Sequence, residues 1–189
     1  MIRIAILGDI GSGKSYISKL FNYSVFNADV EVGKLYRRNR KCYKKLKKVL
    51  PSYINSFPVK KNQLFKAIKT NHNNLKKINK IIHPEVRKKM NFFFEKNKNK
   101  KFVVLDIPLL LENKINNKKD FLVFIDSKKG DVEKRLKKRK NFNRKLIKKF
   151  KNIQLPLDYK KKKSQYVIKN KFNEKSVNNS IQYILNKIL

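Results

Sequence analysis

Eight residues near the start of the chain have the types and the spacing needed to bind phosphate groups. Positions 8–15 are Gly-Asp-Ile-Gly-Ser-Gly-Lys-Ser, which fits the pattern G-x-x-x-x-G-K-[ST]. Glycines let the backbone turn so that successive N–H groups point at one anion. In such a loop, the lysine reaches the β- and γ-phosphates of a nucleoside triphosphate, and the final hydroxyl binds Mg²⁺. From this loop and the residue after it we expect nucleotide contacts by Gly8, Asp9, Ile10, Gly11, Ser12, Gly13, Lys14, Ser15 and Tyr16.

Two aspartates follow short apolar runs and are candidates for chemistry beside the phosphates. Asp29 follows the run 25–28, and Asp106 follows the run 102–105. In open α/β folds, ligands bind at the carboxyl ends of parallel strands, where both side chains would lie. Asp29 could then accept a proton from a substrate hydroxyl, or it could cap a helix that starts near Val30. Asp106 is typical of the acidic residue that helps to hold Mg²⁺ in phosphate-loop proteins.

The elements that must position these residues alternate between strands and helices. Helical spacing of apolar residues follows the phosphate loop and returns at the C-terminal end, over 177–188. Such alternation predicts an α/β fold in which helices cover both faces of a parallel sheet. Ser127 is expected to cap the helix after the fourth strand. Apolar runs predict five short strands, at 2–7, 25–28, 102–105, 121–125 and 166–168.

The sequence pattern of residues 30–99 indicates helices alone, unlike the alternating strands and helices around it. Its apolar residues recur at helical spacing, and no run typical of a buried parallel strand occurs there. His83 and Pro84 predict the start of a further helix, because proline suits the first helical turn. We therefore expect a helical insert between the second and third strands of the sheet.

Basic residues near position 140 are candidates for further phosphate contacts. Arg135 and Arg139 lie four residues apart on one helical face. Guanidinium groups can grip phosphate oxygens through two parallel hydrogen bonds, although this pair could also form a solvated face. The polar segment 140–163 has few residues suited to a core, so we predict that it forms a mobile lid with Arg144 as a second phosphate contact.

The composition limits the class of protein. The 189 residues are 40% hydrophobic, which is enough for one domain with a real core. Cys42 is the single cysteine, so an intramolecular disulfide and a cysteine zinc cluster are both excluded. No apolar run is long enough for a membrane span, and the N-terminus lacks a signal pattern. We expect a cytoplasmic protein without a membrane partner.

The net charge of +37 raises the question of a nucleic-acid partner. Only eight of the 50 Lys and Arg residues are arginine, and the lysines are spread along the whole chain. Lysine, asparagine and isoleucine all have A/T-rich codons, so a biased genome would give this composition without any partner. We favour that explanation and expect no nucleic-acid partner. A positive field would also steer polyanionic substrates toward the protein.

Several motifs occur together in an order that resembles the dephospho-coenzyme A kinase family, and the resemblance covers almost the whole chain. The stretch at 106–113 and the His-Pro pair are more specific than the phosphate loop, which alone indicates only nucleotide binding. After the phosphate loop, the motifs are Phe-Asn-Ala-Asp at 26–29, His-Pro-Glu-Val-Arg at 83–87, Asp-Ile-Pro-Leu-Leu-Leu-Glu-Asn at 106–113, Lys-Arg-Leu-Lys-Lys-Arg at 134–139, Gln-Leu-Pro at 154–156 and Val-Ile-Lys-Asn at 167–170.

The resemblance implies ATP-dependent, Mg²⁺-assisted phosphorylation of the ribose 3′-hydroxyl of dephospho-CoA. It also implies a P-loop NTPase fold of the nucleotide-kinase type, with a five-stranded parallel sheet flanked by helices. Such a chain is a single domain with a core at about 1–29, 100–139 and 164–189, a helical coenzyme A-binding insert at about 30–99, and a lid at about 140–163.

The resemblance also implies roles for individual residues. Asp29 matches the catalytic base, and Lys14 and Arg139 match residues that face the phosphates during transfer. Ser15 matches the Mg²⁺ ligand, with Asp106 as a second candidate. From the residues alone, His83 could instead be a cap or a surface residue, and Glu112 could brace its own segment. The positions that match the acceptor side are Asp29, His83, Arg87, Pro108, Leu109 and Glu112.

The chain departs from the family pattern at several positions. Asp9 stands where glycine is usual, Asn27 stands where aspartate is usual, and Tyr16 stands where threonine is usual. Ser164 and Gln165 replace an Ala-Asp pair. None of these changes removes a core catalytic group, and we expect an active monomer. Two alternatives stay open: another small-molecule or nucleotide kinase of the same fold, and a basic nucleotide-binding protein associated with nucleic acid.

Overall fold

The computed structural model describes residues 1–71, 73–138 and 142–189, except for the side chains of residues 145, 146 and 149. The chain forms two compact units, which are described separately. The first unit joins residues 1–27 to residues 97–189, and the second comprises residues 28–96. The chain therefore leaves the first unit after its second strand and returns to it before the third.

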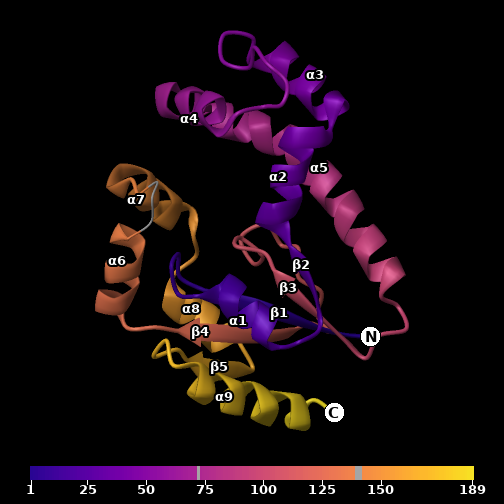
Figure 1. The fold of residues 1–189 in the computed structure, drawn as a ribbon, viewed down its shortest axis with the longest axis vertical. Coiled ribbons are helices and arrows are strands. Elements are labelled where there is room, and N and C mark those ends of the chain that lie inside the picture. Colours follow the sequence, from indigo (N-terminus) through magenta and orange to yellow (C-terminus); the bar gives the residue numbers. More distant parts are fainter. Residues whose placement is uncertain (72, 139–141) are drawn as a thin grey trace. The chain divides into compact units, whose positions relative to one another are not determined.

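The first unit is built on a five-stranded sheet in which every pair of neighbouring strands is parallel (Figure 1). The strand order is β2-β3-β1-β4-β5, so β1 lies at the centre. This confirms the α/β fold and the parallel sheet expected from the sequence. The strands are β1 (Ile2–Gly8), β2 (Ser24–Asn27), β3 (Phe102–Asp106), β4 (Phe121–Asp126) and β5 (Tyr166–Lys169).

Strand β1 shows why these segments form a buried sheet. It has a neighbour on each side, and Ile4, Ala5 and Ile6 are fully buried, because a central parallel strand is covered on both faces. Helices α1 (Lys14–Leu20) and α9 (Glu174–Lys187) pack with the sheet in one core. That core consists of Ile4, Ile6, Ile17, Phe21, Phe102, Val104, Val123, Ile125, Ile168, Val177, Ile181, Ile184, Leu185 and Ile188.

Among the described residues between β4 and β5, the first unit has three further helices. They are α6 (Lys129–Lys137), α7 (Arg144–Ile153) and α8 (Leu157–Lys163). Helix α8 packs on β1 and β4, and α6 places Val132 and Leu136 in buried positions near the phosphate loop. Helices α7 and α8 thus fall within the segment 140–163, whose role as a lid stays a prediction.

The described residues of the second unit form four helices and no strand, and residues 50–60, between the second and third of these helices, are irregular. Helix α5 (Asn73–Lys96) packs against α2 (Ala28–Arg38), α3 (Arg40–Val49) and α4 (Lys61–Thr70). The unit has its own core, in which the thiol of Cys42 is buried. This core consists of Leu35, Cys42, Leu46, Leu50, Ile54, Val59, Leu64, Ala67, Ile78 and Ile82.

Three local expectations from the sequence were wrong. Pro84 does not begin a helix but lies inside α5, where apolar packing on both sides of it outweighs the loss of one backbone donor. Asp29 does not directly follow a strand, because β2 ends at Asn27 and Asp29 lies in the first turn of α2. Ser127 does not cap α6, because Lys128 is the N-cap residue and the Ser127 hydroxyl bonds elsewhere.

Candidate active site

The phosphate loop joins the end of β1 to the start of α1, and its glycines adopt conformations that other residues avoid. Gly11 and Gly13 have φ angles of 88° and 92°. A Cβ atom on Gly11 would lie 2.9 Å from Leu136, and one on Gly13 would lie 2.8 Å from the side-chain nitrogen of Asn170. Both the backbone angles and the close neighbours therefore require glycine at these two positions.

Lys14 lies folded over its own loop. Its ammonium group donates to the carbonyl oxygen of Gly8 at 3.0 Å and to that of Asp9 at 2.6 Å. These bonds hold a positive charge beside the loop, where the motif predicts the phosphates of a nucleotide. Ser15 is the second residue of α1 and is exposed, so its hydroxyl is accessible to a ligand.

Asp9 brings a carboxylate into the phosphate loop and binds two partners. One oxygen accepts a hydrogen bond from the backbone N–H of Ile10 at 2.6 Å. The other oxygen forms an ion pair with the ammonium group of Lys151 on α7 at 2.9 Å. The negative charge at this position is therefore balanced by a cation from a segment more than 140 residues away in sequence.

Two loops from neighbouring strands hold the phosphate loop through one backbone oxygen. The carbonyl of Ser12 accepts from the hydroxyl of Ser127 at 3.0 Å and from the side-chain amide of Asn170 at 2.8 Å. Asn170 is fixed in turn, because its own N–H donates to the carbonyl of Asp126 at 2.7 Å. The ends of β4 and β5 thus position the phosphate loop.

Asp106 lies at the end of β3, buried, and opposite Asn27 at the end of β2. The side-chain amide of Asn27 donates to the carboxylate of Asp106. An aspartate at position 27 would place a second negative charge there, whereas asparagine supplies a donor. The departure from the family pattern at position 27 therefore supplies a hydrogen-bond donor to Asp106 instead of a second carboxylate.

The available oxygen donors suit Mg²⁺. This ion prefers oxygen ligands and usually binds one or two carboxylates or hydroxyls together with substrate phosphates and water. Ser15 and Asp106 supply that kind of donor, and the described residues contain no cluster of three or more His, Cys, Asp or Glu side chains that could hold a metal without substrate. The donor set thus fits an ion that arrives with a nucleotide.

Glu112 forms a buried ion pair with Lys160 of α8. The carboxylate oxygen lies 2.6 Å from the ammonium nitrogen and also accepts from the N–H of Leu155 at 3.0 Å. The Glu112 and Lys160 side chains are only 9% and 1% exposed. This supports the bracing role left open for Glu112, while a contact with the acceptor stays a prediction. Lys160 was missed because it lies in a run of four lysines whose sequence does not distinguish one from another.

Arg135 lies against an aromatic ring in the loop after β5. Its guanidinium carbon is 4.3 Å from the ring centroid of Phe172, which is a cation–π contact. Phe172 has a φ angle of 58°, and its N–H donates to the side-chain oxygen of Asn170. Because a Cβ on Gly13 would lie 3.6 Å from the Phe172 ring, this contact borders the phosphate loop. Sequence reasoning did not single out Phe172.

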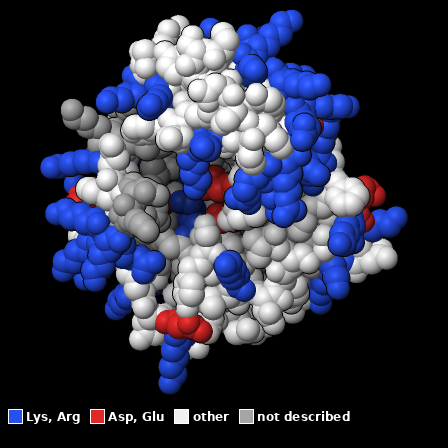
Figure 2. All heavy atoms as spheres, turned by 45° about the horizontal axis from the view of Figure 1, so that its top comes forward, with Lys and Arg blue, Asp and Glu red and all other residues white. Residues whose placement is uncertain are grey.

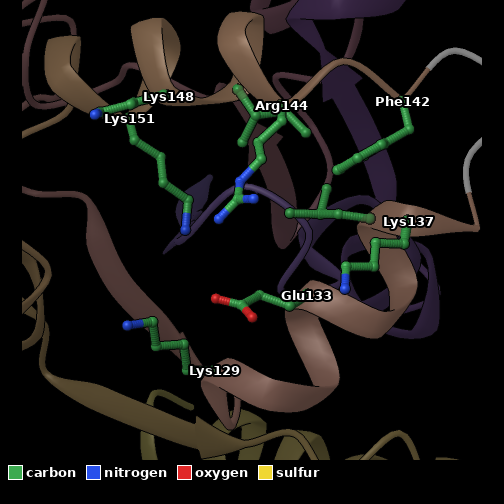
Figure 3. A pocket seen from close by; sticks show the side chains of 9 residues that line it. Lys129, Glu133, Lys137, Phe142, Arg144, Lys148 and Lys151 are labelled. Atoms are coloured by element: carbon green, nitrogen blue, oxygen red, sulfur yellow. The ribbon is translucent and has the colours of Figure 1, made fainter.

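A cavity of about 570 Å³ lies between α6 and α7 (Figure 3). Arg144 and Lys151 extend into it from α7, and Glu133 points into it from α6. Leu136, Phe142 and Ile147 form the apolar part of its wall. Arg139, the predicted lid-base arginine, lies outside the described residues.

The remaining predicted acceptor residues are divided between the two units. In the second unit, Asp29 lies in the first turn of α2, and His83 and Arg87 lie one turn apart on α5. Burial and, to a smaller extent, the charge of Arg87 lower the pKa of His83, which favours a neutral imidazole. In the first unit, Pro108 and Leu109 are partly exposed just after β3.

Tyr16 follows the phosphate loop and is engaged with the C-terminal helix. Its hydroxyl donates to the carboxylate of Glu174 at the start of α9, and this bond raises the pKa of Tyr16. A contact between Tyr16 and nucleotide stays a prediction.

Among the described helices, none is long and apolar enough to cross a membrane.

Comparison with known proteins identifies the family. The family model for dephospho-CoA kinase matches residues 2–176. The dephospho-CoA kinase of Wolbachia sp. subsp. Brugia malayi is 30% identical over 190 residues, with 98% of this chain and 97% of the relative covered. That of Bacillus cereus strain ATCC 14579 is 30% identical over 193 residues, with 98% and 96% covered.

Solved structures agree on the fold. TT1252 from Thermus thermophilus matches with a TM-score of 0.79 at 23% identity, covering 100% of this chain and 98% of the other. Dephospho-CoA kinase from Campylobacter jejuni matches with a TM-score of 0.65 at 19% identity and the same coverage. Together with the family model, these findings confirm the resemblance seen in the motifs. The chain belongs to the dephospho-CoA kinase family, whose members are kinases that phosphorylate a hydroxyl group in the last step of coenzyme A biosynthesis.

Proposed function

We propose that this chain transfers the γ-phosphoryl group of Mg·ATP to the ribose 3′-hydroxyl of dephospho-CoA. The observation that carries the proposal is the phosphate loop at the end of β1, with Lys14 folded over it, in a chain whose family match spans residues 2–176. Phosphoryl transfer passes through a loose transition state, so it depends on positioning and on neutralising charge more than on covalent chemistry.

The phosphate loop supplies the donor side of the reaction. On nucleotide binding, Lys14 exchanges the carbonyls of Gly8 and Asp9 for phosphate oxygens, and the loop N–H groups surround the same anion. Ser15 and Asp106 would hold Mg²⁺. This ion would supply charge neutralisation at the phosphates when it is bound. Arg139 and Arg144 are proposed to face the phosphates from the predicted lid.

Asp29 is proposed to orient the acceptor hydroxyl and to accept its proton. A carboxylate is suited to this task because proton loss from the hydroxyl is late in a loose transition state. His83, Arg87, Pro108 and Leu109 are proposed to line the acceptor site. For Glu112 we propose a positioning role, since its carboxylate is already bonded to Lys160 and Leu155.

The surface charge suits substrates of this kind. On the face seen in Figure 2, Lys and Arg side chains are spread widely, whereas Asp and Glu are few. A positive field of this extent attracts polyanions such as ATP and dephospho-CoA. The absence of a nucleic-acid partner stays a prediction. Cytoplasmic location and a monomeric state stay predictions.

The test is ADP release from Mg·ATP with and without dephospho-CoA, for the wild type, Asp29→Asn and Glu31→Gln. Glu31 is a matched control, because it is a second carboxylate in the first turn of α2 and pairs with Lys34. We expect strong stimulation by dephospho-CoA in the wild type and in Glu31→Gln, with a loss of about 10²-fold or more in Asp29→Asn.

Three other outcomes of this assay would contradict parts of the proposal. Stimulation that survives Asp29→Asn would retain the substrate and exclude Asp29 as the base. If Glu31→Gln loses as much stimulation by dephospho-CoA as Asp29→Asn does, removal of any negative charge from this turn is harmful. If dephospho-CoA gives no stimulation in the wild type, the proposed reaction is wrong.

A further inference from the structure

We propose that Lys151 is a phosphate-binding residue of the nucleotide site and that Asp9 positions it. This proposal rests on the proposed use of ATP. The starting observation is the ion pair between the Lys151 ammonium group and the Asp9 carboxylate, at 2.9 Å. It places a cation from α7 at the phosphate loop, although Lys151 belongs to no motif of the family pattern.

Two lysine ammonium groups donate hydrogen bonds to Asp9. Lys14 donates to its carbonyl oxygen at 2.6 Å, and Lys151 donates to its carboxylate. The carbonyl and carboxylate of one aspartate are a few ångström apart, so both cations lie at the same part of the loop. Lys14 is the phosphate ligand that the motif predicts, and Lys151 is therefore close to where the phosphates bind.

The chemistry of the pair allows a phosphate contact. A lysine ammonium has three donors, and the bond to Asp9 uses one of them. The second Asp9 oxygen is bonded to the N–H of Ile10, which fixes the carboxylate relative to the loop. A lysine held in this way reaches an anion with less loss of side-chain freedom than an unrestrained one. The exposed fraction of the Lys151 side chain is 36%, so its remaining donors are accessible.

A simpler role for Lys151 would be to neutralise Asp9, whose charge would otherwise repel the nucleotide. The two roles make different predictions in a chain that lacks the Asp9 charge. If Lys151 only neutralises Asp9, it becomes dispensable in Asp9→Asn. If Lys151 contacts phosphate, its removal still weakens binding there. Asp9→Asn keeps an oxygen for the Ile10 N–H, so the loop retains that bond.

The experiment measures the dissociation constant of Mg·ATP by calorimetry for the wild type, Lys151→Met, Asp9→Asn and the double variant. Lys148→Met is the matched control, because Lys148 lies one turn earlier on α7 and lines the same cavity, without an ion pair to Asp9 (Figure 3). Thermal unfolding of each variant checks that it is folded. We expect about tenfold weaker binding for Lys151→Met and less than about twofold for Lys148→Met.

The decisive comparison is between Asp9→Asn and the double variant. A further loss of about fivefold or more in the double variant supports the phosphate contact. Equal affinities for these two variants would overturn it, as would equal losses in Lys151→Met and Lys148→Met. Failure of the proposed function looks different: the wild type would then bind no Mg·ATP or show no turnover with dephospho-CoA.

Discussion

The buried ion pair between Glu112 and Lys160 gives the sharpest prediction about stability. It joins the segment after β3 to α8, and both side chains are almost fully buried. Glu112→Gln removes the negative charge but keeps an oxygen that can accept from the Leu155 N–H. The change therefore isolates the effect of leaving the Lys160 charge buried without a counter-charge.

The expected cost follows from the burial. Breaking a buried pair from one side typically costs about 3–5 kcal/mol, because the remaining charge stays out of water without compensation. For a chain of 189 residues, about 1 kcal/mol corresponds to a shift of roughly 2–4 °C in Tm. Glu112→Gln should then lower Tm by about 6 °C or more, and Lys160→Met should lower it by a similar amount.

The double variant Glu112→Gln/Lys160→Met tests the reasoning. Replacing both charges with neutral groups of similar size is often close to neutral in stability, so the double variant should be more stable than either single variant. Lys161→Met is the control, since Lys161 is the next residue of α8 but pairs with Asp126 at an exposed position. Its Tm should stay close to that of the wild type.

Thermal unfolding followed by circular dichroism measures all four variants. The reasoning is refuted if each single variant unfolds within about 2 °C of the wild type, or if the double variant is less stable than both. Equal losses for Lys160→Met and Lys161→Met would show that burial of the pair is not what matters. Dephospho-CoA turnover of Glu112→Gln at a temperature where it is folded separates bracing from acceptor binding.

Two further predictions follow from the site. Gly13→Ala should weaken Mg·ATP binding by about 10²-fold or more, because φ is 92° at this position and the new methyl group would meet Asn170. Titration with nucleotide measures the affinity of this variant, and a near-normal affinity would contradict the prediction. The lowered pKa of His83 means that the unfolded chain binds a proton at a higher pH than the folded chain does, so stability should fall as pH drops below about 6.5. His83→Gln should reduce this loss in Tm measured between pH 5 and 8, and an unchanged pH profile would argue against His83 as its source.

Much of the fold could be predicted from the sequence, because the signals are strong where burial is complete. Strands β1, β3 and β4 are nearly continuous apolar runs, as expected for parallel strands covered on both faces. The phosphate loop was also predictable, since only glycine fits the backbone angles at Gly11 and Gly13.

The errors came from places where local preference competes with packing. Pro84 favours a helix start by local rules, but α5 continues through it because Ile78 and Ile82 are buried before it and Val86 packs on the same core after it. Ser127 has the side chain of a capping residue, yet its hydroxyl bonds to the carbonyl of Ser12, more than 100 residues away.

The parts of the site that escaped prediction depend on contacts between distant segments. Lys160, Lys151 and Phe172 have no sequence signal that separates them from similar neighbours. Their roles depend on Glu112, Asp9 and Arg135, which only the fold brings close. In a chain with so many lysines, sequence alone does not indicate which of them is paired.

The strand order also bears on how the chain folds during synthesis. Within the part of the chain that the structure describes, β1 pairs only with β3 and β4, and β2 pairs only with β3. Neither can therefore join the sheet until residues beyond 101 have left the ribosome. The helices of residues 28–96 have a core of their own and can form first. At translation rates of about 5–20 residues per second, the two apolar strands stay unpaired for several seconds or longer. The dense positive charge of the nascent chain, by keeping chains apart through mutual repulsion, would protect it from aggregation in that interval.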